Sequence, residues 1–119
     1  MKYVYPAIFY RATDGGYCID FPDVEGATTQ ADTIYEAIEM AEDALVGMLV
    51  CYEDYKAGRL DHEMKNRIVE PTPIEEVKAE PDEYSTGAFV TLIKADTDAY
   101  RKILAEIDAK RAREAELVS

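Results

Sequence analysis

Two short runs near the start of the chain have the residue pattern of β-strands, the first mostly apolar and aromatic and the second alternating between apolar and polar residues. Residues 2–10 are rich in tyrosine and β-branched side chains and therefore predict a strand. Because Pro6 has no amide hydrogen, we expect this strand to lie at a sheet edge or to carry a bulge there. Asp14, Gly15 and Gly16 favour a tight hairpin turn. A second strand follows, with Tyr17, Ile19 and Phe21 on one face and Cys18 and Asp20 on the other.

A turn at residues 22–26 and a short third strand at residues 27–31 lead into a long helix. Thr33 can accept a hydrogen bond from the amide three residues later while Glu36 reaches back, which is the capping-box arrangement. Apolar residues then recur at intervals of three and four and predict one face packed on the sheet: Ile34, Ala37 or Ile38, Ala41, Leu45, Met48, Leu49 and Tyr52. We expect the helix to end before Gly58.

The periodicity is lost over residues 59–87, which collect proline, glycine and charged residues and predict a long irregular connection. Residues 89–93 predict a fourth strand, and Asp96 or Thr97 is expected to cap a second helix. The short apolar stripe of this helix consists of Tyr100, Ile103, Leu104 and Ile107. Beyond Asp108 the stripe fades, so we expect the end of the helix to fray.

These elements predict an α+β fold: a three-stranded antiparallel meander, a long helix packed on one face, a fourth strand and a carboxy-terminal helix. At 119 residues the chain is long enough for one domain with a hydrophobic core and too short for two ordinary ones. We expect the domain to span residues 1–100 and a carboxy-terminal helical tail to span residues 97–119.

The charge is strongly acidic and unevenly distributed. The chain has 13 basic and 25 acidic residues, a net charge of −12. Residues 1–100 alone carry a net charge of −13, whereas residues 101–119 carry +1. This charge disfavours nucleic-acid binding over most of the surface; it favours a basic partner, or serves plain solubility.

Residues with catalytic or metal-binding chemistry are sparse. His62 is the only histidine, and Cys18 and Cys51 show no Cys-x-x-Cys spacing, which favours neither a zinc site nor a disulfide framework. A carboxylate cluster after the second strand has ligand types that suit magnesium, but acidic loops flanked by proline and glycine more often serve turns and solvation. The cluster comprises Asp20, Asp23, Glu25 and Asp32. We therefore expect no enzyme activity, no cofactor and no metal site.

The expected environment of the chain follows from its apolar runs and thiols. No apolar run reaches the roughly 18 residues that span a bilayer, and the first residues lack the pattern of a secretion signal. Together with two unpaired cysteines, this predicts a cytoplasmic protein without membrane contact.

The stretch from Gly15 to Ala37 carries an ordered series of motifs. Gly-Gly-Tyr is followed by alternating residues, by Phe-Pro-Asp, by a hydrophobic residue and Gly26, and then by Thr28, Asp32-Thr33 and Glu36-Ala37. This order resembles the start of HicB antitoxins, small acidic proteins that neutralise the messenger-RNA-cleaving HicA toxins of bacteria and archaea. The chain departs from the family pattern at three positions, where proline, cysteine and glycine are common: Glu25, Ala27 and Ala31.

The resemblance implies a partial ribonuclease H-like or double-stranded-RNA-binding-like fold and a HicA-like toxin as partner. The expected function is an antitoxin that covers the toxin's active site, with regulation of its own operon as a further expectation. The residues expected to contact the toxin are Tyr17, Asp20, Phe21, Asp23, Glu25, Glu39, Glu42 and Asp43. The alternatives are an orphan HicB-like domain, acting as an oligomeric scaffold or a ligand-binding regulator, and a hydrolase that uses the carboxylate cluster.

Two further expectations concern DNA and assembly. HicB antitoxins often contact DNA through a carboxy-terminal ribbon-helix-helix or helix-turn-helix segment, whereas this chain offers one predicted helix there. We therefore expect weak DNA binding at most, through Lys110, Arg111 and Arg113. The tyrosine-rich first strand, with an exposed edge, favours a homo-oligomer, either a dimer or a tetramer.

Overall fold

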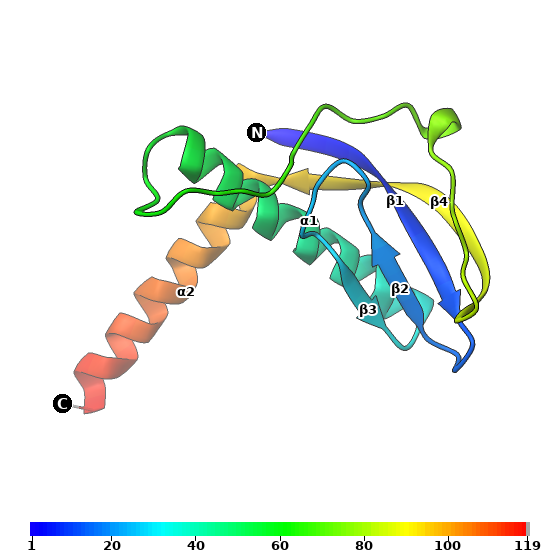
Figure 1. Cartoon of the computed structure of the whole chain (residues 1–119). Coiled ribbons are helices and arrows are strands. Elements are labelled where there is room, and N and C mark those ends of the chain that lie inside the picture. The colour runs from blue at the N-terminus through cyan, green and yellow to red at the C-terminus, as the bar shows by residue number, and fades with distance from the viewer. Residues whose placement is uncertain (119) are drawn as a thin grey trace.

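The computed structural model describes residues 1–118, with side chains described as far as Leu117. Its elements are β1 (Lys2–Ala12), β2 (Tyr17–Asp20), β3 (Thr29–Ala31), α1 (Ile34–Lys56), the short 3-10 helix η1 (Ile74–Glu76), β4 (Ser85–Asp96) and α2 (Thr97–Val118). The predicted α+β fold is confirmed, with a sheet on one side and α1 against it (Figure 1).

The sheet has the order β3-β2-β1-β4, and every neighbouring pair is antiparallel. The predicted edge position of the first strand is therefore wrong, because β1 lies between β2 and β4. Pro6 is tolerated because β2 pairs with β1 only from Ile8 onward, so one side of Pro6 has no strand partner. The register shift lies between Arg11 and Ala12 rather than at Pro6. The hairpin turn is confirmed by Gly15, whose φ is +103°.

α1 packs against one face of the sheet and closes the core. Its predicted start is confirmed, since the Thr33 side chain accepts a hydrogen bond from the Glu36 amide at 3.2 Å, and Gly58 follows its end with a φ of +75°. The buried helix residues are Ala37, Ala41, Leu45, Val46, Leu49 and Val50. From the sheet, the core receives Tyr5, Ala7, Phe9, Ile19, Phe21, Ile93 and Ala95, among others. The predicted core face of β2 is thus confirmed at Ile19 and Phe21.

Residues 57–84, which we call the strap, run from the end of α1 past the side of β1 that β2 leaves unpaired, and they end on the helix-free face of the sheet (Figure 1). The strap is irregular, as predicted, and is fastened at separate points. The Tyr5 hydroxyl donates to the carbonyl of Val69 at 2.9 Å, and Val24 forms an isolated antiparallel bridge with Ile68. Further along, the Glu80 amide donates to the Tyr10 hydroxyl at 3.3 Å. The strap therefore follows a defined course although it has almost no regular structure.

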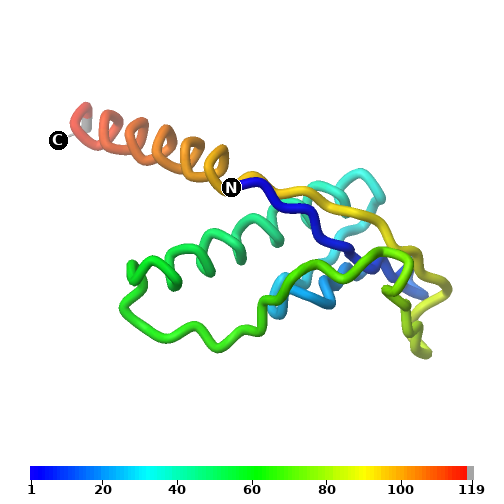
Figure 2. The backbone as a smooth tube through the Cα atoms, turned by 90° about the horizontal axis from the view of Figure 1, so that it is seen from above, coloured from blue at the N-terminus to red at the C-terminus, as the bar shows by residue number. Residues whose placement is uncertain are grey.

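β4 and α2 are both longer than the sequence predicts. β4 runs for 12 residues, and α2 continues without a break to Val118, so the expected fraying beyond Asp108 is not observed. The Asp96 carboxylate caps α2 by accepting from the Ala99 amide at 3.1 Å. After its first turns α2 projects away from the domain, as both views show (Figures 1 and 2).

Candidate functional site

Three of the residues predicted to contact a partner lie within the fold or fasten the strap. Phe21 is 2% exposed and belongs to the core, and Asp23 is 5% exposed. The Asp23 carboxylate accepts hydrogen bonds from the Thr72 amide at 2.8 Å and from the Thr72 hydroxyl at 2.7 Å. The Glu25 carboxylate accepts from the Arg67 amide at 3.2 Å. Phe21 and Asp23 are therefore buried within the fold, whereas Glu25 is exposed and also contacts the strap; the expected contact of these three residues with a partner stays a prediction.

The remaining predicted contact residues are divided between two surfaces. Asp20 lies opposite Ile8 in the sheet and points to the face that α1 does not cover, since its neighbour Ile19 points into the core. Tyr17 is half-buried, with the Arg11 guanidinium 5.9 Å from its ring centre. A separate acidic surface lies on the exposed side of α1 and consists of Glu39, Glu42 and Asp43. The structure does not bring the two groups together.

The helix-free face carries a concave acidic surface of about 530 Å³ around Asp20. It lies between the β1–β2 hairpin and the end of the strap. The side chains that define this acidic hollow are Tyr10, Asp14, Cys18, Asp20, Glu80, Asp82 and Tyr84. Sequence reasoning missed all of these except Asp20, because the fold brings residues of the strap to a hairpin some 60 positions earlier in the chain.

The carboxylates of the acidic hollow differ in whether they accept hydrogen bonds from other residues. Those of Asp20 and Glu80 make no hydrogen bond or ion pair with any described residue. Asp82 accepts from the Tyr84 amide at 2.9 Å, and Asp14 accepts from the Gly16 amide at 3.5 Å. None of the described residues that line the hollow is basic. The hollow therefore presents negative charge beside two tyrosine rings, a combination that suits lysine and arginine side chains.

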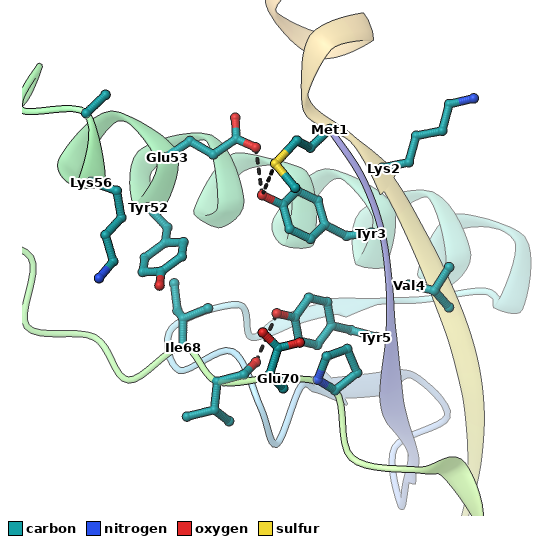
Figure 3. Close-up of a pocket in the computed structure, with 13 residues that line it drawn as sticks. Met1, Lys2, Tyr3, Val4, Tyr5, Tyr52, Glu53, Lys56, Ile68 and Glu70 are labelled. Carbon is teal, nitrogen blue, oxygen red and sulfur yellow. Dashed lines mark hydrogen bonds between the residues drawn. The ribbon is translucent and has the colours of Figure 1, made fainter.

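A larger groove of about 1080 Å³ lies between the start of β1, the end of α1 and the strap (Figure 3). This tyrosine groove is lined by Tyr3, Tyr5, Tyr52, Glu53, Lys56 and Glu70, among others. The Tyr3 hydroxyl donates to Glu53 at 2.7 Å, and the Lys56 ammonium lies 5.5 Å from the Tyr52 ring centre. Burial raises the pKa of Tyr3 and Tyr5. Because its polar groups are largely paired and its charges have both signs, the groove is less selective for a basic partner.

Glu53 joins three elements at one side of the tyrosine groove. Its carboxylate accepts hydrogen bonds from the Tyr3 hydroxyl of β1, from the Thr97 hydroxyl at 2.8 Å and from the Arg101 guanidinium at 3.1 Å. Burial opposes ionisation, but these donors together hold the pKa of Glu53 below its ordinary value of 4.5. The sequence pattern gave no signal for this contact, which connects α2 to the domain.

The described part of the chain shows neither a cluster of metal ligands nor a helix suited to a membrane. Residues 1–118 contain no group of three or more histidine, cysteine or carboxylate side chains that could hold a metal ion. No described helix is long and apolar enough to cross a membrane. Cys18 and Cys51 are both exposed free thiols.

Residues 5–114 match the family model described as the HicB-like antitoxin of the bacterial toxin–antitoxin system. The chain belongs to this HicB-like antitoxin family. The resemblance inferred from residues 15–37 is thus confirmed. Curated relatives include Antitoxin HicB 1 of Photorhabdus laumondii, 50% identical over 42 residues, and Antitoxin HicB of Escherichia coli K12, 45% identical over 42 residues. These matches span 35% of this chain and 27% and 30% of the two relatives, less than a third of their lengths.

Solved structures of HicB-like and toxin–antitoxin proteins share the fold. A toxin–antitoxin complex from Streptococcus pneumoniae aligns with a TM-score of 0.58 and 25% identity, covering 84% of this chain and 73% of that chain. The amino-terminal domain of Burkholderia pseudomallei antitoxin HicB aligns with a TM-score of 0.54 and 24% identity, covering 79% and 99%. The HicB-like chain therefore has the fold of an antitoxin domain.

Proposed function

We propose that this HicB-like chain neutralises a HicA-type messenger-RNA-cleaving toxin by binding it through the acidic hollow. Family membership supports an antitoxin role, and the hollow supplies a surface with the required charge. The observation that carries the choice of surface is that Asp20 and Glu80 present unpaired carboxylates in a concavity without a basic lining residue.

The physical basis of neutralisation is competition for basic groups. A nuclease that cleaves RNA holds the phosphate backbone with lysine and arginine side chains. Carboxylates that bind those groups cover the surface that RNA needs, while the rings of Tyr10 and Tyr84 add contact area. The net charge of −12 attracts a basic toxin over a distance, so association accelerates at low ionic strength.

Charge reversal on the two acidic surfaces tests this assignment. One variant carries Asp20→Lys and Glu80→Lys; its matched control carries Glu39→Lys and Asp43→Lys on α1, with the same change in net charge. The binding partner is an inactive form of a purified HicA-type protein, titrated by calorimetry at 50 and 300 mM salt. We expect the hollow variant to lose at least about tenfold in affinity and the control less than about threefold.

The titrations distinguish toxin binding at the hollow from toxin binding at α1 and from a domain that has no toxin partner. A loss confined to the α1 variant would place the toxin on the helix surface instead of the hollow. Absence of binding by the unmodified chain at both salt concentrations would contradict the antitoxin–HicA pairing and favour an orphan domain. Regulation of the operon by this chain alone is not favoured, because the basic residues of α2 lie on a single helix with five acidic neighbours.

A further inference from the structure

The longest unpaired backbone edge in the described part of the sheet belongs to β4. β4 pairs with β1 from Lys2 to Ala12 and occupies the end of the strand order, so its second side has no partner (Figure 1). The opposite edge, β3, has only three residues and continues almost directly into α1. β4 therefore presents a row of free amides and carbonyls that another strand can pair with.

β4 lacks the features that usually protect such an edge. It contains no proline, and its two charged residues, Lys94 and Asp96, lie among its last three positions. The one register shift in the ladder faces the beginning of the strand, between Arg11 and Ala12 of β1. A proline, a central charge or a central bulge would each obstruct pairing, and the middle of β4 has none of them.

Apolar side chains flank this edge on both faces of the sheet. Leu92 lies opposite Pro6 on the helix-free face and is 52% exposed. Phe89 lies on the α1 side, stacked on Phe9 with ring centres 5.0 Å apart, and is still 39% exposed. An additional strand beside β4 would cover both side chains as well as the backbone groups.

The distribution of charge favours a second copy of this chain, and not a basic toxin, as the partner of the β4 edge. The exposed face of α1 and the acidic hollow would repel another acidic molecule, whereas β4 carries one basic and one acidic residue and is neutral. A basic toxin gains no charge attraction at β4, but a second copy of this chain can approach there with the least repulsion. An antiparallel strand pair is also self-complementary, as a twofold dimer requires.

We propose that two copies of the chain pair through antiparallel β4 strands and form one continuous eight-stranded sheet. In such a pair, opposite residues face the same side of the sheet, so both α1 helices lie on one face. This dimer differs from the assembly through β1 expected from the sequence, because β1 is internal. It is also independent of the proposed toxin surface.

The mass of the full-length chain, measured by sedimentation between about 5 and 200 µM, tests the proposal. Leu92→Glu is the test variant. Val4→Glu is its control, because Val4 is 50% exposed on the same sheet face but lies on the internal strand β1. We expect a dimer whose dissociation constant rises at least about tenfold in Leu92→Glu and less than about threefold in Val4→Glu. Raising the salt should tighten the dimer, since it screens repulsion between two chains of net charge −12.

Amide hydrogen exchange supplies a second measurement that does not depend on a substitution. Residues of β4 should show slower exchange at alternate positions at high protein concentration, because those amides acquire partners only in the dimer. A monomer at 200 µM and high salt would overturn the proposal. So would a dimer that Ile107→Glu in α2 dissociates and Leu92→Glu does not.

Discussion

The two long helices are almost equal in length but differ sharply in how much of their surface is buried. α1 has 23 residues and buries six of them, while α2 has 22 residues, of which only Thr97, the first, is buried among those whose side chains are described. Both have an apolar stripe at helical spacing. The comparison shows that periodicity predicts a helix and its apolar face, but not whether anything covers that face.

The difference arises from residue size and from the anchoring of each helix. Ala37 and Ala41 are fully buried and allow α1 to approach the sheet closely, after which Leu45 and Leu49 fill the core. α2 is held at its first turns by the Glu53 contacts, and it then leaves the sheet. Its apolar stripe, Ile103, Leu104 and Ile107, therefore stays 40–54% exposed.

The largest expected difference comes from truncating one apolar residue in each helix. Leu45 is 0% exposed, so Leu45→Ala should lower the free energy of unfolding by about 2–5 kcal/mol through lost burial and a cavity. Ile107 is 41% exposed, so Ile107→Ala should cost less than about 1 kcal/mol. Urea unfolding of both variants measures the contrast. Equal losses would mean that α2 is covered in solution and that the comparison fails.

An intermediate effect is expected at the junction of the helices. Glu53→Gln weakens the contacts to Tyr3, Thr97 and Arg101 and should cost about 1–3 kcal/mol at pH 7. Because the folded pKa of Glu53 lies below 4.5, its ionised form stabilises the protein above that pH. The contribution is lost as the pH falls through the folded pKa.

The stability difference between Glu53→Gln and the unmodified chain should therefore shrink below pH 4.5. Denaturant titrations at several pH values between 3 and 7 provide the measurement. A difference that stays constant over this range would show that the ionised carboxylate is not what joins α2 to the domain.

The smallest effect is expected at the far end of α2. Replacing Lys110, Arg111 and Arg113 with alanine should change stability by less than about 0.5 kcal/mol, because all three are exposed. We also expect the unmodified chain to give no sequence-specific gel shift with its own promoter below about 1 µM at physiological salt. Strong retardation that the triple variant loses would identify α2 as a DNA-binding arm.

The sequence predicted correctly those features that depend only on residues close together in the chain. The Gly15 turn, the Thr33 cap and the alternation at Ile19 and Phe21 each depend on a few neighbouring residues, and each was predicted correctly. The position of β1 inside the sheet was not predicted, because it depends on pairing with β4, some 85 residues away in the chain. Pro6 suggested an edge, but the short β2 leaves room for proline within an internal strand.

In the candidate site, too, some residues could be predicted from the local sequence pattern and others only from the fold. Asp20 could be predicted from the alternation of β2, which places it on the face opposite the core. Glu80 and Asp82 lie in a segment without periodicity, so only the fastened course of the strap brings them to Asp20. Asp23 and Glu25 looked available to a partner in the sequence, but the strap uses their carboxylates.

The strap also bears on how a family of such antitoxins can diversify. Its fastening points are the Asp23 carboxylate in the turn after β2 and the Tyr10 hydroxyl of β1, while the intervening chain is mostly exposed. Insertions between those points cost little, because the entropy of closing a loop grows only slowly with its length. Since the strap contributes Glu80 and Asp82 to the hollow, mutations confined to it can alter the proposed recognition surface without disturbing the core. Under the proposed binding mode, partner choice and folding can therefore evolve as separate traits in this architecture.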